Sequence, residues 1–308
     1  MFTGRTVAMP MHCIFIGNPG NGKSTLLNIL CNTPHFKGGY SVGTGLTTKG
    51  SEVTIGGITY MDIPGLYDID PSKHANASAE ISKALKRGGD YKVIFVVGDQ
   101  NGRVVTEDVA TMNIVLAAAP EITMNNFGLI VNMACKKTMA LPQMGKDSQG
   151  SFTASLFCER PDVSTAHILF LPVIADMEGA SSEAMNLASV RDLTEIQNFM
   201  KFVTTIPSVA LTIEKVSNIN HTEIAAYVTE VSKSVGLLDN NEAMKDAVKK
   251  QIEANNQKAG NVLSALIGTV ANAERVAPVG EGLAAGGGDS VLLGAPASAG
   301  LSHSCGTC

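Results

Sequence analysis

The stretch that decides the fold is Gly17-Asn-Pro-Gly-Asn-Gly-Lys-Ser-Thr25, which matches the pattern G-x-x-x-x-G-K-[ST] without a mismatch. The residues before it, His12–Ile16, form a short apolar run with β-branched members, and Leu26–Leu30 after it open an apolar helix. In this context the glycines let the backbone bend so that successive N–H groups converge on a phosphate chain. The pattern therefore predicts a phosphate-binding loop. The alternative is a glycine-rich turn that binds nothing.

The side chains of this loop have distinct expected roles. Lys23 would reach the β and γ phosphates, Ser24 would give its hydroxyl to Mg²⁺, and Thr25 would contact the nucleotide near the α phosphate. The other predicted nucleotide contacts of the loop are Gly17, Asn18, Gly20, Asn21 and Gly22.

Composition limits the class of protein. The chain has 308 residues and a formal net charge of -5. Its length suits one large α/β domain with additional helices. The acidic balance disfavours a nucleic-acid partner, which requires clustered Lys and Arg. No run approaches about 18 uninterrupted apolar residues, and Met1–Met11 lacks the apolar core of a signal peptide. We therefore expect a soluble, cytoplasmic protein.

The segment Lys37–Gly50 is too rich in Gly, Ser and Thr to hold regular structure unaided. In P-loop switch proteins a Thr of the corresponding loop enters the Mg²⁺ shell, and the loop is ordered by the triphosphate. Thr47 is the predicted residue and Thr48 the second choice. The alternative is an ordinary surface loop.

A hairpin is predicted over Glu52–Tyr60, turning at two glycines, and it leads into Asp62-Ile-Pro-Gly65. At the end of a buried strand Asp62 would hold a Mg²⁺-bound water, and the Gly65 amide would approach the γ phosphate. The next residue is Leu66, where Ras-type GTPases carry a glutamine that orients the attacking water. Because an aliphatic side chain cannot hydrogen-bond to water, unaided hydrolysis is expected to be slow.

Later segments complete the predicted sheet. Tyr91–Gly98 is a continuous apolar run suited to a parallel strand covered on both faces, and Gly128–Val131 and His167–Ile174 are the strands that follow it. A charged helix is predicted over Ala79–Arg87. Arg191–Ile206 has the helical spacing of a closing helix packed on the sheet.

A short box, Gly102-Arg-Val-Val-Thr-Glu-Asp108, precedes an apolar helix. Thr106 would cap this helix, and the acids that follow it, including Asp108, would complement the positive end of the helix dipole. Arg103 lies before the helix without a local carboxylate partner, and it would project from the loop on the ligand side of the sheet.

Together, Asp62-Ile-Pro-Gly-Leu-Tyr-Asp68, Val93-Ile-Phe-Val-Val97 and the 102–108 box resemble the immunity-associated nucleotide-binding (GIMAP or IAN) GTPases, a group related to septins and Toc receptors. The resemblance covers about residues 10–210. It implies a Ras-like P-loop NTPase domain, an α/β fold with a mostly parallel sheet and helices on both faces. It also implies a GTP/GDP- and Mg²⁺-dependent switch that forms homodimers or oligomers through its nucleotide face, and it leaves peripheral association with an intracellular membrane open.

The residues that match the motifs of that group are Gly17, Gly22, Lys23, Ser24, Thr47, Asp62, Gly65 and Arg103. By this resemblance Lys23, Thr47 and Arg103 are the predicted catalytic residues. The predicted metal ligands are Ser24, Thr47 and Asp62. Arg103 would stabilise the transition state across a dimer, an effect of about 10³ to 10⁵ in rate where such fingers operate. A surface or interface ion pair is its alternative role.

The base-reading element departs from the group, because the expected [NT]-[KR]-x-D is Asn132-Met-Ala-Cys135. Asn132 would bind the N7 and O6 region of the purine, and Met133 would pack on the ring. Cys135 cannot accept from guanine N1–H and N2–H, a loss of about 1.5 to 3 kcal/mol, or roughly one to two orders of magnitude of guanine preference. A nucleotide-binding scaffold without turnover and an NTPase without strict guanine specificity therefore remain alternatives to a slow GTPase.

The carboxy-terminal third is predicted as a helical extension over 211–276 and a disordered Gly/Ala/Ser-rich tail over 277–308. Helices are predicted over Thr222–Val235 and Asp239–Ala259, each ended by a glycine. The ending Cys305-Gly-Thr-Cys308 lacks the aliphatic pair of a prenylation motif, so exposed thiols are favoured over lipidation.

Overall fold

Strand β1, Met11–Ile16, establishes the layers of the fold, because successive side chains of a strand point to opposite faces. Cys13 and Phe15 belong to one buried apolar cluster, whereas Ile14 and Ile16 belong to another. A strand buried on both faces requires a layer of helices on each side of the sheet.

The computed structural model describes residues 9–39, 45–68, 70–140, 152–163, 167–175, 185–255 and 257. Besides β1, its strands are β2 Ser51–Ile55, β3 Ile58–Asp62, β4 Gly89–Gly98, β5 Phe127–Ala134, β6 Ile168–Pro172 and β7 Val209–Leu211. They form one seven-stranded sheet in the order β2-β3-β1-β4-β5-β6, with β7 paired to β4. The pairs from β3 to β6 are parallel, and β2–β3 and β4–β7 are antiparallel.

The β2–β3 hairpin turns where the sequence predicted. Gly56 and Gly57 connect its strands with φ angles of +59° and +82°, values that favour glycine. Strand β4 pairs with β1 along one of its edges and with two strands along the other. On that second edge, β7 pairs with Gly89–Tyr91 and β5 pairs with Val93–Gly98.

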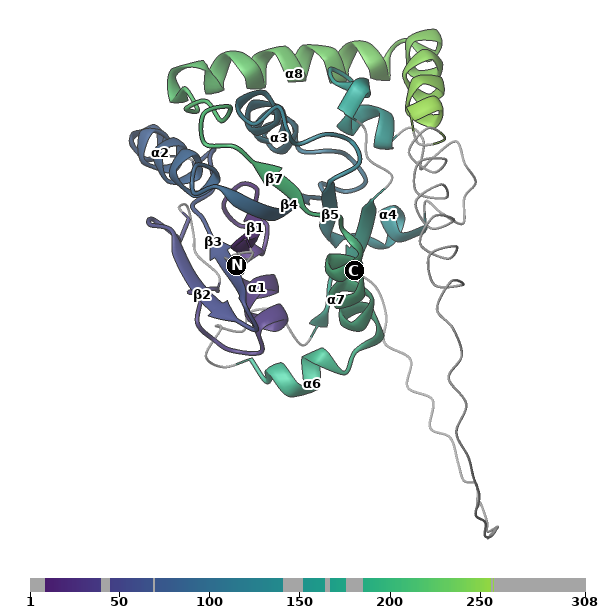
Figure 1. Cartoon of the computed structure of the whole chain (residues 1–308). Helices are drawn as coiled ribbons and strands as arrows, with labels where there is room; N and C mark the ends of the chain where they lie inside the picture. Colours follow the sequence, from purple (N-terminus) through teal and green to yellow (C-terminus); the bar gives the residue numbers. More distant parts are fainter. Residues whose placement is uncertain are drawn as a thin grey trace, which may run out of the picture. The chain divides into compact units, whose positions relative to one another are not determined.

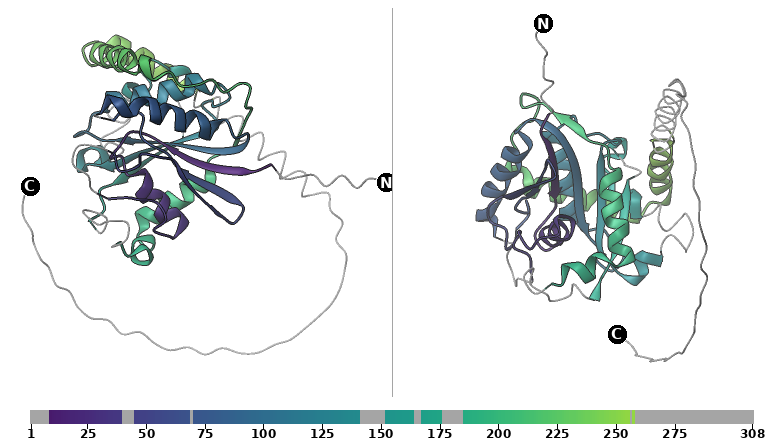
Figure 2. Two further views of the ribbon diagram at one scale, coloured as in Figure 1. Left: turned by 90° about the vertical axis from the view of Figure 1, so that its left-hand side faces the viewer. Right: turned by 60° about the horizontal axis from the view of Figure 1, so that its bottom comes forward.

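The helices include α1 Lys23–Cys31, α2 His74–Leu85, α3 Thr106–Ala118, α4 Lys136–Ala140, α6 Leu187–Arg191, α7 Thr194–Thr205 and α8 Ile224–Asp239, and residues 152–156 and 242–255 are helical as well. Short 3-10 helices occur at η1 Pro71–Lys73, η2 Pro161–Val163 and η4 His221–Glu223. As Figures 1 and 2 show, α2, α3 and α8 lie on one face of the sheet, and α1, α6 and α7 lie on the other. The predicted α/β architecture, a mostly parallel sheet with helices on both faces, is confirmed.

Helix α8 is packed on the domain rather than separate from it. It lies along α3, and its residues Ile224, Val231 and Leu238 join the buried cluster that α2 and α3 form over the sheet. The predicted end of this helix at Gly236 is wrong, because α8 continues to Asp239. The burial of Leu238 beyond the glycine outweighs the cost of glycine in a helix, about 1 kcal/mol.

Two further local predictions differ from the structure. The closing helix predicted over Arg191–Ile206 is α7, which begins three residues later, at Thr194, because Arg191 is the last residue of the preceding helix α6. Thr106 was predicted to cap α3, but Val105 is the N-cap, and the Thr106 hydroxyl donates to Glu107 Oε2 at 3.2 Å. Both differences lie within three residues of an element end, where local signals are weakest.

Strands β1, β3, β4 and β5 run parallel, so their carboxyl ends meet at one edge of the sheet, here called the ligand edge. In open α/β sheets ligands bind at this edge. The loops that follow these strands carry the G-x-x-x-x-G-K-[ST], D-x-x-G, 102–108 and Asn132 motifs.

The described helices include none that is long and apolar enough to span a bilayer. The predicted disordered tail, 277–308, with its cysteine ending, lies outside the described residues. The division of the chain at residues 210 and 276 stays a prediction.

Candidate functional site

The phosphate-loop motif connects β1 to α1 at the ligand edge. Its backbone passes twice through the left-handed region, at Gly20 with φ +84° and Gly22 with φ +83°. A β-carbon on Gly17 would lie 2.1 Å from the Val96 carbonyl oxygen, so no side chain fits there. Lys23 is the first residue of α1, and the loop therefore presents a helix N-terminus, whose free amides and dipole attract an anion.

Lys23 is buried at this helix start, with 6% of its surface exposed. Its Nζ donates to the Asn18 carbonyl at 3.0 Å. Burial lowers the pKa of Lys23, while the nearby carboxylates of Asp62 and Asp108 raise it. An ammonium group has three donors, and the described residues engage one of them, so two are available to phosphate oxygens.

Three side-chain oxygens from separate segments meet beside Lys23. Ser24 Oγ donates to Asp62 Oδ2 at 2.7 Å, and Thr47 Oγ1 lies 3.3 Å from each of these two atoms. Thr25 follows Ser24 in the first turn of α1 and is partly exposed. Hydroxyl and carboxylate oxygens are the ligands that Mg²⁺ accepts alongside phosphate and water.

The second carboxylate oxygen of Asp62 tests whether a metal fits. Asp62 is 1% exposed, and its Oδ1 has no hydrogen-bond partner among the described residues. Burial raises the pKa of Asp62, and Lys23 with the Ser24 and Thr47 hydroxyls opposes that rise. A buried acceptor without a partner is costly unless a ligand or water satisfies it, so these residues fit a hydrated Mg²⁺. No group of three or more His, Cys, Asp or Glu side chains elsewhere in the described chain suggests a different metal site.

Asp108 holds the phosphate loop to the end of β4 by hydrogen bonds. Its Oδ1 accepts from Asn18 Nδ2 and Asn21 Nδ2, both at 2.8 Å, and its Oδ2 accepts from Gly98 N at 2.7 Å. Burial raises the pKa of Asp108 to about 6 against the opposing effect of these hydrogen bonds. Asp108 lies in the first turn of α3, as predicted, and the fold also brings three amide donors to its carboxylate.

Asn18 extends this network to the D-x-x-G segment. Its Oδ1 accepts from Tyr67 N at 3.1 Å and from Thr111 Oγ1 at 2.8 Å. Asn21 Nδ2 also donates to the Val96 carbonyl at 3.0 Å. The two asparagines were predicted as nucleotide contacts. Their side chains hold the loop to β4, α3 and the segment after D-x-x-G, and the Asn21 amide donates to the Asn18 carbonyl at 3.4 Å. Their contact with a nucleotide stays a prediction.

Gly65 lies directly against the phosphate loop. A β-carbon there would be 2.2 Å from Pro19 Cδ and 2.7 Å from the Asn18 carbonyl carbon, so only glycine permits this approach. The following residue, Leu66, is fully buried in the apolar cluster beneath α2. The side chain at the position of the Ras-type glutamine is therefore in the core and not at the ligand edge.

The loop that carries Arg103 is a tight turn after β4. Gln100 and Arg103 exchange two backbone hydrogen bonds of 3.0 and 3.1 Å, and Asp99 Oδ1 accepts from Gly102 N at 2.7 Å. The Arg103 side chain is exposed, and no hydrogen bond or ion pair holds its guanidinium within the described structure. Within one copy of the chain, no described hydrogen bond or ion pair joins the Arg103 side chain to the Lys23, Ser24, Thr47 and Asp62 cluster.

The predicted base-reading residues lie at the end of β5. Asn132 is buried, and its Nδ2 donates to the Asn21 carbonyl at 2.8 Å. Met133 adopts φ +55° and is 42% exposed. Cys135 N donates to Asp99 Oδ2 at 2.8 Å, and its Sγ lies 3.4 Å from Thr138 Oγ1. The exposed Met133 is the side chain here that is open to contact a base.

Sequence reasoning missed three residues of the site. Asp108 and Thr111 hold the phosphate loop, and Asp99 holds the turn before α3 to the base-reading segment. The position of Asp108 inside the 102–108 box was a signal for the first of these. The other two carry no motif, and only the packing of α3 and β5 beside the loop reveals them.

Residues 12–127 match a family model described as a 50S ribosome-binding GTPase. Residues 12–127 therefore match a P-loop GTPase domain, and the nucleotide and metal of such a domain are GTP or GDP and Mg²⁺. A search of curated proteins gives no match.

Several solved structures are similar to the chain at low identity. Toc33 from Arabidopsis thaliana in complex with GDP and Mg²⁺ is 17% identical over 67% of this chain and 88% of that one, with a TM-score of 0.44. Era in complex with MgGDPNP and 16S ribosomal RNA nucleotides is 16% identical over 63% of this chain, with a TM-score of 0.35. The chain spans 57% of the Era chain. NFeoB from S. thermophilus bound to GDP·AlF4⁻ and K⁺ is 12% identical over 82% of this chain and 91% of that one, with a TM-score of 0.36.

Proposed function

We propose that this chain is a GTP-binding switch protein that hydrolyses GTP slowly and self-associates according to its nucleotide state. The observation that carries the proposal is the convergence of Ser24, Thr47 and Asp62 oxygens, within 3.3 Å of one another, beside the buried Lys23. These residues come from three separate segments of the chain. Their common purpose would be to hold the phosphate end of a Mg²⁺-bound nucleotide.

Each of these residues has a chemical role in the proposal. Lys23 would donate to the β and γ phosphates, while the Ser24 and Thr47 hydroxyls and a water held by Asp62 would complete the metal shell. Mg²⁺, when bound, would neutralise charge on the phosphate oxygens. The Gly65 amide would donate to the γ phosphate from the position where it already touches the phosphate loop.

Slow hydrolysis is supported by the burial of Leu66. The side chain after the D-x-x-G glycine would have to reach the ligand edge to orient an attacking water, and this one is apolar and lies in the core. Turnover by a single copy should then resemble that of unassisted switch GTPases, about 10⁻³ s⁻¹ or less.

Self-association across the nucleotide face is supported by the exposed Arg103. Its guanidinium is held by no described group of its own chain and stands on the turn after β4 at the ligand edge. A second copy facing this edge would bring an arginine toward the phosphates, where it would stabilise the negative charge of the transition state.

Membership of the GIMAP/IAN group is proposed on the motif resemblance over residues 10–210. The same resemblance is the basis for proposing that the protein associates with an intracellular membrane. The proposed location is the cytoplasm.

Two other functions are each favoured by one observation. The core position of Leu66 suits a scaffold that holds nucleotide without meaningful turnover. Cys135, in the place of the guanine-reading aspartate, suits an NTPase without strict guanine specificity. Both alternatives keep the phosphate loop, and they differ from the proposal in turnover or in the choice of base.

Calorimetric titration of GTP, GDP, ATP and XTP in the presence of Mg²⁺ separates these functions. The proposal expects GTP and GDP to bind the wild type, with at least tenfold preference over ATP, and to lose affinity in Lys23→Ala. Equal affinity for GTP and ATP would favour the unselective NTPase. Phosphate release that is undetectable at every protein concentration would favour the scaffold, and no binding of any nucleotide would refute all three.

A further inference from the structure

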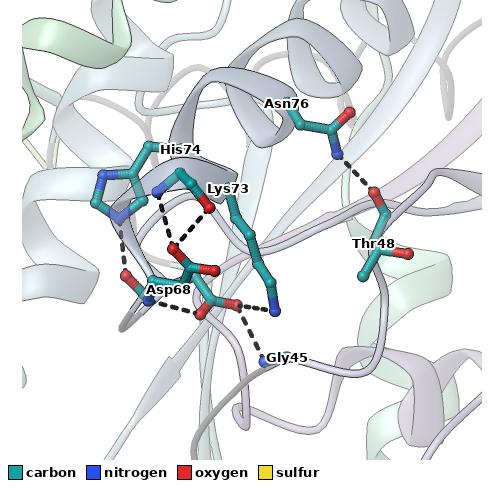
Figure 3. Close-up of polar contacts among 8 residues, drawn as sticks. Gly45, Thr48, Asp68, Lys73, His74 and Asn76 are labelled. Atoms are coloured by element: carbon teal, nitrogen blue, oxygen red, sulfur yellow. Dashed lines mark hydrogen bonds and ion pairs between the residues drawn. The ribbon is translucent and has the colours of Figure 1, made fainter.

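A carboxylate outside the phosphate loop holds the segment that carries Thr47. Asp68 lies three residues beyond Gly65 and is 6% exposed. Its Oδ2 accepts from Gly45 N at 3.0 Å and lies 3.7 Å from Lys73 Nζ, as Figure 3 shows. Its Oδ1 accepts from Asp70 N at 3.0 Å. Both oxygens of Asp68 are therefore used, one of them by the Thr47 segment.

The backbone of Asp68 is itself fixed to the site. His74 Nε2 donates to the Asp68 carbonyl at 2.8 Å, and the His74 ring stacks on Tyr67 with a centroid distance of 5.5 Å. Tyr67 N in turn donates to Asn18 in the phosphate loop. The position of Asp68 is thus linked to the phosphate loop through its immediate neighbour.

Two side chains of α2 contact the other end of the same segment. Asn76 Nδ2 donates to the Thr48 carbonyl at 2.6 Å, and Glu80 Oε2 accepts from Gly50 N at 2.9 Å. Like Asp68, Asn76 and Glu80 bind backbone groups of the segment 45–50. These hydrogen bonds therefore do not depend on the side chains of the segment. Thr47 lies between the points that are held.

Gly45 is closely packed between Pro19 of the phosphate loop and the Asp68 carboxylate. A β-carbon there would lie 3.1 Å from Pro19 Cβ in the phosphate loop and 3.2 Å from Asp68 Oδ2. The segment therefore passes between the phosphate loop and the Asp68 carboxylate. A shift of either one would displace Gly45.

We propose that Asp68 is a positioning residue for Thr47, which couples the D-x-x-G segment to the segment 45–50. This inference rests on the proposed function, since it assigns the contact a role in nucleotide binding. A γ phosphate that draws in the Gly65 amide would also fix Asp68, three residues on, and through Gly45 it would fix Thr47 at the metal. GDP lacks the γ phosphate and would gain little from the same contact.

The first test needs no nucleotide. Lys49 is exposed and lies within the segment 45–50, so trypsin cleavage after it reports how firmly the segment is held. Asp68→Asn and Asp68→Ala should raise the cleavage rate about tenfold, because a charge-assisted hydrogen bond is lost. Asp70→Asn is the matched control and should stay within about twofold of the wild type, since the exposed Asp70 side chain bonds Ser72 and not this segment. Unchanged cleavage in both Asp68 variants overturns the inference.

The second test compares affinities for Mg²⁺–GMPPNP and Mg²⁺–GDP. Asp68→Asn and Asp68→Ala should weaken GMPPNP binding about tenfold or more and GDP binding less than about threefold. An equal loss for both nucleotides would make Asp68 merely structural and overturn the inference. If the wild type binds neither nucleotide, the proposed function fails, and the cleavage comparison still decides whether Asp68 holds the segment.

Discussion

At the residue scale, the site is built from buried polar groups whose partners are distant in sequence. Asp108 lies 90 residues after Asn18, yet the two side chains are hydrogen-bonded and buried. Asp62 shows the complementary case, a buried carboxylate with one oxygen satisfied and the other without a described partner. Satisfied groups stiffen the loop, whereas the unsatisfied oxygen marks where a ligand is needed.

Replacement of Thr47 by alanine should impair Mg²⁺-dependent nucleotide use more than the same change at Thr48. Thr47 Oγ1 lies beside the Ser24 and Asp62 oxygens, whereas Thr48 is exposed and contributes its carbonyl to Asn76. We expect Thr47→Ala to lower Mg²⁺-dependent GTP affinity or turnover by about tenfold or more, and Thr48→Ala by less than about twofold. Mg²⁺ titrations of mant-GTP binding and phosphate release would measure both. Equal effects of the two substitutions would contradict the assignment of Thr47.

Asp108 should make the nucleotide-free protein lose stability as pH rises from about 4 to about 6. Its pKa is raised to about 6 in the folded state, so the folded state binds a proton that the unfolded state has already released in that range. The corresponding loss is of the order of 2 to 3 kcal/mol and is complete above pH 6.

Urea unfolding of the wild type and Asp108→Asn at several pH values would measure this contribution. The stability of the wild type relative to the variant should fall between pH 4 and 6, and the difference should level off above that range. Parallel profiles for the two proteins would show that Asp108 does not titrate there.

At the element scale, the ends of helices are held by residues from other elements. Lys92 in β4 donates from Nζ to the carbonyls of Val203, Thr204 and Ile206, at 3.2, 2.8 and 2.6 Å, at the end of α7. A lysine at a helix C-terminus satisfies free carbonyls and complements the dipole. Helix α8 is likewise held by packing along α3 and not by a cap at Gly236.

Two adjacent leucines of α8 provide a matched test of that packing. Leu238 is fully buried in the cluster with α3, whereas Leu237 is 61% exposed. Leu238→Ala should lower the free energy of unfolding by about 2 to 5 kcal/mol, and Leu237→Ala by less than about 0.5 kcal/mol. Chemical denaturation of both variants is the measurement. A similar small effect of both would mean that α8 does not pack on the domain in solution.

At the scale of the whole molecule, one edge of the sheet collects the phosphate-loop, D-x-x-G, 102–108 and Asn132 motifs, while Arg103 projects without a described partner in its own chain. A single copy therefore has the groups to bind a triphosphate but lacks a side chain at the Leu66 position that could direct water. A second copy facing the same edge would supply the positive charge of its Arg103 to the phosphates bound by the first copy.

GTP hydrolysis per molecule should accordingly rise with protein concentration, and Arg103→Ala should abolish the rise. Arg87→Ala is the matched control, because Arg87 is paired with Glu52 before the start of β4, at the opposite end of that strand from Arg103. It should leave the concentration dependence unchanged. Phosphate release measured over a hundredfold range of concentration, with sedimentation in parallel, would test this. A rate that rises equally in Arg103→Ala would assign the assistance to another residue.

Much of the fold could be predicted because its signals are local. The apolar runs before Gly17 and around Tyr91–Gly98, together with the glycine turn at 56–57, determined the strands and the hairpin through side-chain alternation and backbone freedom. The same local chemistry indicated a phosphate loop ahead of a helix. Element ends were less predictable, as at Gly236, since there long-range packing outweighs local preference.

The sequence by itself therefore determined the class of domain and the motifs at its ligand edge. Only the tertiary structure decided that Asp108 braces the phosphate loop, that Leu66 is in the core and that Asp68 holds Gly45. The physical reason is that a hydrogen bond or a buried contact depends on which segments the fold brings together. No spacing along the chain encodes a partner 23 or 90 residues away.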